Sequence, residues 1–109
     1  MSSEPGVVVV FTSRRTEADD AEYAERSARL AEQVEQHPGF VKRISMRDPV
    51  TREGVTLAWF TGDDAVQAWK RHPDHAEAQR RGIEAFYEEY HLTVAEVIRD
   101  YGWSKAEQT

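Results

Sequence analysis

A β-hairpin is predicted by residues 40–60, which read FVKRISMRDPVTREGVTLAWF. Apolar and polar residues alternate over 40–47, with Phe40, Ile44 and Met46 assigned to one face and Lys42 interrupting the pattern. Residues 48–54 carry Asp, Pro and Gly, which favour turns. Residues 55–60 then return as a strand that is apolar on both faces.

A strand and a helix precede this hairpin. Residues 7–11 (VVVVF) are apolar at both parities, which is typical of a strand buried on both faces. Thr16 is expected to N-cap an amphipathic helix that runs to Gln36. His37, Pro38 and Gly39 are expected to end it.

The chain after the hairpin predicts more helix and a last strand. Residues 61–64 cap a helical region that continues through Trp69, and Pro73 begins a second helix reaching about Glu89. Residues 91–101 read as the final strand. The order βαββαβ predicts a ferredoxin-like α+β fold, a four-stranded antiparallel sheet with its helices on one face.

Domain organisation and assembly follow from this pattern. Residues 6–103 are expected to form one domain between loose tails at 1–5 and 104–109. Because the helices cover one face while residues 7–11 and 55–60 are apolar on both, the second face needs a cover. A second copy of the chain is the simplest one, so a homodimer packed through its sheets is expected.

Composition excludes several functions. With 109 residues and no Cys, one domain is expected, without disulfides, thiolate metal sites or cysteine nucleophiles. A net charge of −6 disfavours nucleic-acid partners and anionic membranes. No apolar run approaches the roughly 20 residues of a membrane span, and the N-terminus lacks signal-peptide layout, so a cytoplasmic location is expected. Abundant Ala and Arg suggest a GC-rich bacterial source.

The densest chemistry lies in residues 69–79, WKRHPDHAEAQ. His72 and His75 could face one way and hold a metal, with Asp74 or Glu77 as a further ligand. The alternative, which we prefer, is a polar helix entry in which His72 acts as a cap before Pro73, with no metal.

Aromatic residues are the second feature. An aromatic-lined cavity between sheet and helices would suit a flat ligand. Alternatively, most of these side chains are core, although Trp69 stands beside a helix break and two imidazoles. The candidate residues that line this cavity are the aromatic side chains and one imidazole of Phe11, Trp59, His72, Phe86 and Tyr90.

Other catalytic patterns are scarce. No Ser lies in a nucleophile-elbow setting, and no Gly-rich phosphate loop occurs. Acid–base work would fall to His75, His72 or Tyr87. RNA-recognition domains share the topology, but here residues 55–60 carry no basic side chain, which disfavours RNA binding.

Residues 69–101 resemble the antibiotic biosynthesis monooxygenase (ABM) family. The matching pattern is W-x-x-H-x-x-H-x-x-A-Q-x-x-G, then F-Y-x-x-Y and V-x-x-V-x-R-x-Y, which begins at Trp69 and ends at Tyr101. Gly39, Phe40, Trp59 and Phe60 fit too. The resemblance implies a dimeric α/β barrel in which the last strand helps to join the subunits.

The branches of this family imply different activities. One oxidises anthrone-type substrates with O₂ and no metal or flavin, using Trp and Asn; Trp69 resembles its helix Trp, but the chain has no Asn. A haem-degrading branch uses an Asn on the first strand, where Phe11 or Thr12 stands, and a His where Ala78 or Gln79 stands. Haem is therefore not expected. A third branch acts on quinols.

The resemblance and the residues together predict a monooxygenase that needs no cofactor and oxidises a flat aromatic or quinol-like molecule with O₂. His75 is the expected base or orienting group, Tyr87 the donor to the developing oxyanion and Trp69 the stacking wall. The alternative is a non-catalytic, small-molecule-binding or stress-related module on the same dimer.

Overall fold

The computed structural model describes residues 4–108, without the side chains of residues 107 and 108. Four strands, three α-helices and two short helical turns follow one another along the chain. They are β1 (Val7–Arg15), α1 (Asp20–Glu35), β2 (Phe40–Arg47), β3 (Glu53–Phe60), α2 (Asp63–Lys70), α3 (Pro73–Arg81), a π-helical turn (Gly82–Phe86), β4 (Tyr87–Glu96) and a 3-10 helix (Lys105–Gln108).

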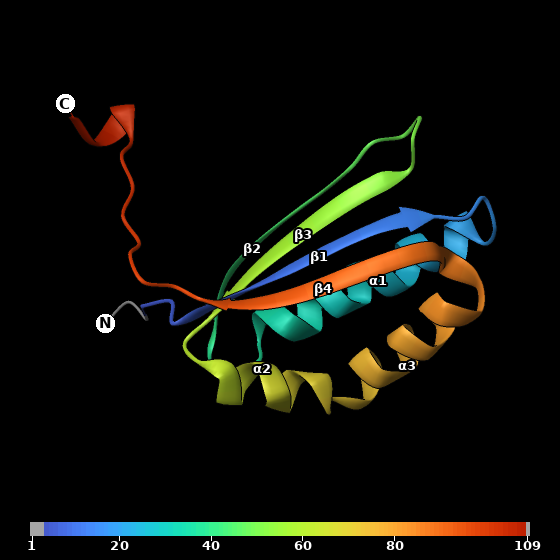
Figure 1. The fold of residues 1–109 in the computed structure, drawn as a ribbon, viewed down its shortest axis with the longest axis horizontal. Helices are drawn as coiled ribbons and strands as arrows, with labels where there is room; N and C mark the ends of the chain where they lie inside the picture. The colour runs from blue at the N-terminus through green and yellow to red at the C-terminus, as the bar shows by residue number, and fades with distance from the viewer. Residues whose placement is uncertain (1–3, 109) are drawn as a thin grey trace.

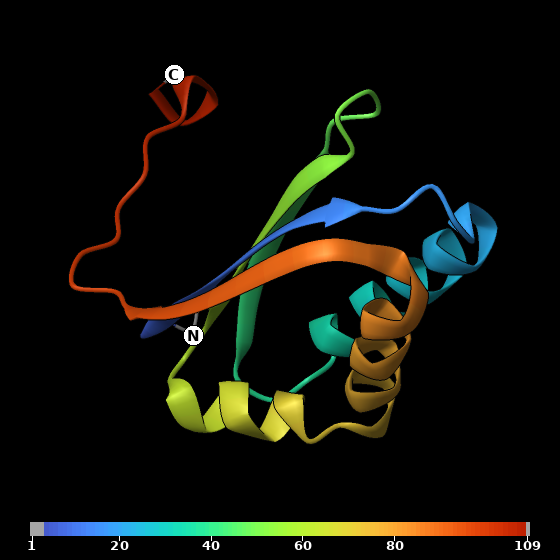
Figure 2. The same cartoon turned by 45° about the vertical axis from the view of Figure 1, so that its right-hand side comes forward.

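The strands form one antiparallel sheet in the order β2-β3-β1-β4, so the predicted ferredoxin-like α+β fold is confirmed. All three α-helices lie on the same side of the sheet (Figures 1 and 2). The core between the two layers is centred on three buried residues, Val7, Val34 and Phe60. Trp69 packs against this cluster from α2.

The hairpin is confirmed, with one correction to its faces. The register shifts between Phe40, which is opposite Phe60, and Lys42, which is opposite Trp59. This bulge adds a residue to β2, so Phe40 faces the helices with Phe60 while Lys42, Ile44 and Met46 share the other face with Trp59. Phe40 therefore does not share a face with Ile44 and Met46, as the simple alternation predicted.

The start of α1 also differs from the prediction. Its N-cap is Asp19, whose φ of 56° lies in the left-handed region, rather than Thr16. The Thr16 hydroxyl instead donates to the Ala85 carbonyl at 2.6 Å, tying this loop to the end of the π-helical turn. The Arg15 guanidinium donates to the Ala18 carbonyl and to the Asp20 carboxylate, and these hydrogen bonds stabilise the loop that precedes the later helix start.

The last helix ends earlier than predicted, and the last strand both begins and ends earlier. The break at Pro73 is confirmed, but α3 ends at Arg81, and β4 covers residues 87–96 instead of 91–101. The reason is pairing with β1, which extends to Arg15 and lies opposite β4 from Val7–Glu96 to Arg15–Tyr87. Ladder hydrogen bonds to β1 thus override the helical pattern of residues 87–89, while residues 82–86 form the π-helical turn.

The chain leaves the sheet after β4. Residues 97–104 extend away from the domain in both ribbon views (Figures 1 and 2). We call residues 97–106 the C-terminal arm. Three of its apolar side chains are strongly exposed: Ile98 at 90%, Tyr101 at 87% and Trp103 at 71%.

Candidate active site

Trp69 lies at the centre of a group of imidazoles at the end of α2. Its ring is 5.1 Å from that of His72, 5.4 Å from that of His75 and 5.5 Å from that of His37. His37 follows α1, so the group joins segments far apart in the sequence. Trp69, His72 and His75, all predicted site residues, therefore come together in the fold.

His72 has the capping role that the sequence indicated. Its Nδ1 accepts the backbone N–H of Asp74 at 3.1 Å, and Pro73 occupies the first turn of α3. Within residues 4–108, no three His, Asp or Glu side chains are grouped so that they could hold a metal ion.

His75 carries a buried nitrogen that stands out among the polar atoms of the protein. Its Nδ1 is the one buried side-chain nitrogen or oxygen within the described residues that has no hydrogen-bond partner. Burial lowers the pKa of His75, and the neighbouring His72 and Lys70 lower it further, against the effect of a hydrogen bond with the Lys70 backbone. At neutral pH the ring is therefore neutral and has an uncommitted nitrogen.

Tyr87 lies in a second aromatic group on the sheet. Its ring and that of Tyr90 each lie 5.6 Å from the ring of Phe11 and 6.1 Å from one another, so the three rings form a compact cluster. Burial and a hydrogen bond with the Tyr23 hydroxyl raise the pKa of Tyr87. The Tyr23 oxygen also accepts from Nη2 of Arg47 at 3.2 Å. Tyr87 is thus held neutral, as a hydrogen-bond donor must be.

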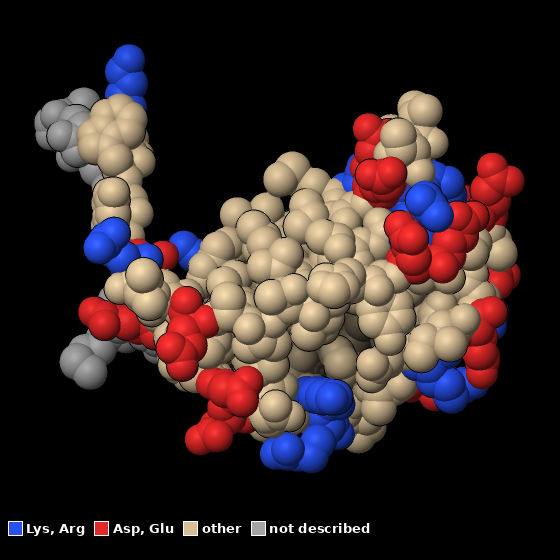
Figure 3. Space-filling view, viewed as in Figure 1, with Lys and Arg blue, Asp and Glu red and all other residues tan. Residues whose placement is uncertain are grey.

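A hollow opens between these two groups. Val9 and Phe11 lie opposite Val94 and Leu92 in the sheet, on the side that faces the helices. Nevertheless Leu92 is 49% exposed and Val94 is 40% exposed, because no helix covers this part of β4. Figure 3 shows the resulting hollow between β4 and the α2–α3 segment, surrounded mainly by uncharged side chains.

Two predicted lining residues lie elsewhere. Phe86 is 3% exposed and packs edge-on against Tyr23 in the interior. Trp59 lies on the opposite face of the sheet, where Nζ of Lys42 is 4.7 Å from its ring centre. Neither borders the hollow, because parity along β3 turns Trp59 away from the helices.

The sequence did not single out His37, Leu92 or Val94. The sequence indicates only a helix terminator at His37, and it is the contact of this segment with α2, where the His37 Nε2 lies 3.2 Å from the Ala65 carbonyl, that brings its ring to Trp69. The alternation of residues 90–94 indicates one face of a strand, but not that the helices leave this face open.

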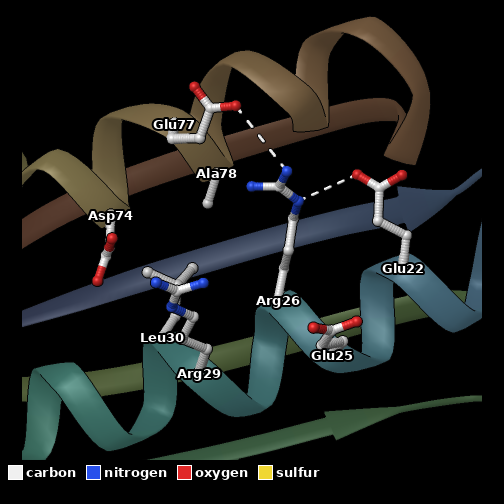
Figure 4. Close-up of a pocket in the computed structure, with 8 residues that line it drawn as sticks. All are labelled: Glu22, Glu25, Arg26, Arg29, Leu30, Asp74, Glu77 and Ala78. Atoms are coloured by element: carbon white, nitrogen blue, oxygen red, sulfur yellow. Dashed lines mark hydrogen bonds and ion pairs between the residues drawn. The ribbon is translucent and has the colours of Figure 1, made fainter.

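A separate groove of about 340 Å³ lies between α1 and α3, on the outer side of the helices (Figure 4). Arg26 crosses it and pairs with Glu22 at 3.0 Å and with Glu77 at 3.9 Å. Leu30 and Ala78 line its apolar part. The candidate metal ligands Asp74 and Glu77 line this groove, whereas the residues predicted for catalysis and substrate binding do not.

The comparisons with known proteins agree with this architecture. A family model described as antibiotic biosynthesis monooxygenase matches residues 6–81. The chain belongs to the ABM family. A relative, the uncharacterized protein YqjZ of Bacillus subtilis, is 33% identical over 95 residues, covering 87% of this chain and 82% of YqjZ.

Solved structures show the same ABM fold at low sequence identity. Rv0793 from Mycobacterium tuberculosis superposes with a TM-score of 0.77 at 10% identity, covering 88% of this chain and 98% of that one. A mutant of SnoaB, a cofactor-independent oxygenase from Streptomyces nogalater, gives a TM-score of 0.73 at 18% identity, covering 89% and 97%. In the described part of this ABM chain, no helix has the length and apolar character of a membrane span.

Proposed function

We propose that this ABM protein is a cofactor-independent monooxygenase that oxidises a flat aromatic or quinol-like small molecule with O₂ in the hollow between β4 and α2–α3. The observation that carries the proposal is the buried, unpartnered Nδ1 of His75, on a ring that packs 5.4 Å from Trp69. A buried polar atom without a partner is costly to keep, which suggests that a ligand supplies the partner. The similarity to SnoaB supports the reaction class.

His75 acts as the base in this proposal. Its neutral ring takes a proton from an activated CH₂ group of the substrate, and the resulting carbanion gives one electron to O₂. Combination of the two radicals forms a C–O bond, and the peroxide anion recovers the proton from His75. Loss of the second C–H proton with cleavage of the O–O bond gives a ketone and water, so that CH₂ and O₂ are converted to C=O and H₂O.

Aromatic side chains orient the substrate. Trp69 provides a stacking wall on the helix side, with His72 beside it, and Phe11 and Tyr90 provide the wall on the sheet side. Tyr87 donates to the developing oxyanion, exchanging its hydrogen bond with Tyr23 for one with the substrate. No metal, flavin or haem takes part in the proposed reaction.

Oxygen uptake with anthrone tests the proposal, since anthrone has an activated CH₂ and its ketone product, anthraquinone, is detected by absorbance. We expect stoichiometric O₂ consumption by the wild type. The His75→Gln variant should lose at least about 100-fold in rate, the usual contribution of a general base. Gln79→Ala, an exposed residue one turn later on α3, is the control and should retain activity.

Two outcomes would contradict the proposal. If anthrone and a panel of hydroquinones bind saturably without O₂ uptake, the protein is a binding module and not an oxygenase. If His75→Gln and Tyr87→Phe both turn over normally, the oxidation takes place without these residues and the assigned roles are wrong.

We also propose that a second copy of this ABM chain covers the face of the sheet that lacks helices. Ile44 is 48% exposed and Met46 is 66% exposed on that face. The C-terminal arm, which extends away from the domain on the side opposite the helices, adds three exposed apolar side chains. A homodimer would bury both surfaces, which would otherwise be an aggregation hazard.

A further inference from the structure

Lys70 and Arg71 are neighbouring cations without partners. They end α2 and follow it, both are exposed, and within residues 4–108 neither side chain forms an ion pair or a hydrogen bond. Most of the other arginines behave differently. Six of them are paired with carboxylates: Arg14, Arg15, Arg26, Arg52, Arg80 and Arg81.

The end of α2, which carries these two residues, borders the hollow. In Figure 3, Lys and Arg side chains gather directly beneath it, over the end of α2, while acidic side chains gather toward the two ends of the molecule. Lys70 follows Trp69 in the sequence, and its positive charge is close enough to lower the pKa of His75. The cationic end of α2 and the imidazole–indole group therefore lie close to one another, beside the same hollow.

Charge at this place changes which ligands the hollow favours. A neutral ring would gain only stacking and burial from the aromatic walls. An ion pair in fully exposed positions is weak, but a ligand anion at the mouth of an apolar hollow is partly shielded from water, and a charge-assisted hydrogen bond is stronger there. A cationic substrate would be repelled by the two side chains.

We propose that Lys70 and Arg71 recognise an anionic group of the ligand, so that the substrate class of this site is a flat aromatic acid, bearing a carboxylate or an ionised phenol. Lys70 and Arg71 are then specificity residues, with no part in the bond-making steps. The inference rests on the proposed function of the hollow as a site for aromatic molecules. To that proposed function it adds that the substrate carries a negative charge.

A pair of probes that differ only in charge tests it. Anthraquinone-2-carboxylate and anthraquinone-2-carboxamide are titrated into the protein by calorimetry at low and at physiological salt. We expect the carboxylate to bind about tenfold more tightly at low salt, with the preference decreasing as salt screens the charges. The double variant Lys70→Gln, Arg71→Gln should bind both probes with nearly equal affinity.

Arg29→Gln is the matched control, because Arg29 is also an exposed, unpaired arginine but lines the outer groove between α1 and α3. It should keep the full preference for the carboxylate. Equal binding of the two probes by the wild type, or an unchanged preference in the double variant, would overturn the inference.

The test separates this inference from the proposed function. If both probes bind equally and anthrone is still oxidised with His75 in place, the oxygenase proposal stands and the anion preference is wrong. If neither probe binds, the hollow does not accept flat aromatic molecules, and both proposals fail.

Discussion

Gly82 packs directly against the ring of Tyr87. A Cβ atom on residue 82 would lie 2.9 Å from Cε2 and 3.0 Å from Cδ2 of that ring. The backbone of Gly82 is helical, with φ of −59°, so any residue could adopt its conformation. It is the space, and not the dihedral angle, that requires glycine here. The π-helical turn thereby fixes how closely Tyr87 approaches Phe11 and Tyr23.

Gly82→Ala should therefore destabilise the protein by about 1–3 kcal/mol, the usual cost of overpacking. The measurement is urea unfolding followed by fluorescence. Gly102→Ala is the control, since a Cβ at residue 102 would meet no heavy atom within 4 Å. Increased stability of Gly82→Ala, the result that helix propensity alone predicts, would show that the Tyr87 ring moves without cost.

Arg47 connects β2 to the polar end of the sheet. It donates to the buried Ser13 hydroxyl at 2.8 Å, to the Arg52 carbonyl at 2.7 Å and to the Tyr23 hydroxyl at 3.2 Å. Arg47→Met should cost about 1–3 kcal/mol in unfolding free energy, because these acceptors lose a charged donor. Arg29→Met, which removes an unpaired arginine, should stay within about 0.5 kcal/mol of wild type. Equal effects of the two variants would refute this role of Arg47.

The stability of the protein should fall as the pH decreases below about 6.5, the ordinary pKa of His75. Because burial lowers the pKa of the folded ring, the unfolded chain binds a proton on His75 at a pH where the folded chain does not. The contribution of His75 to stability is therefore complete at pH values above its pKa in the unfolded chain. It is lost as the pH falls toward its lower pKa in the folded protein. The midpoint of thermal unfolding should change less between pH 7.5 and 5 in His75→Gln than in wild type.

The carboxylate of Glu22 contributes little to the change in stability over this pH range. Arg81 holds the pKa of Glu22 at about 2, from an ordinary value of 4.5, so its contribution is lost only below that ordinary value. Parallel pH curves for wild type and His75→Gln between pH 5 and 7.5 would show that His75 titrates alike in both states.

Charges placed on the open face of the sheet should separate the proposed dimer. Sedimentation of wild type should give twice the 12.5 kDa mass of the chain. Ile44→Lys with Met46→Lys should shift it to monomer by burying like charges at the interface. Val50→Lys, which changes an 87% exposed residue in the hairpin turn, should remain dimeric. A monomeric wild type would refute the dimer.

Sequence patterns predicted some residues of the candidate site correctly and misplaced others. The sequence indicated that His72 and His75, three residues apart, could face one way across a helix start, and that Trp69 stands beside this helix break. The same patterns placed Trp59 with them, because an apolar strand does not show which parity faces the helices. In the sequence, the bulge after Phe40 was visible only as the interruption of the alternation by Lys42. The bulge changed the face of every later residue in β2 relative to Phe40.

The sequence by itself determined the order of elements, the hairpin, the break before Pro73 and the ABM family, because periodicity, turn residues and a missing proline N–H act over a few residues. Tertiary structure decided where β4 begins, which face Trp59 occupies and how His75 is buried next to Lys70. These depend on pairing with β1 and on packing between segments far apart in the chain. Burial and strand pairing contribute free energy only after those segments are in contact in the folded protein.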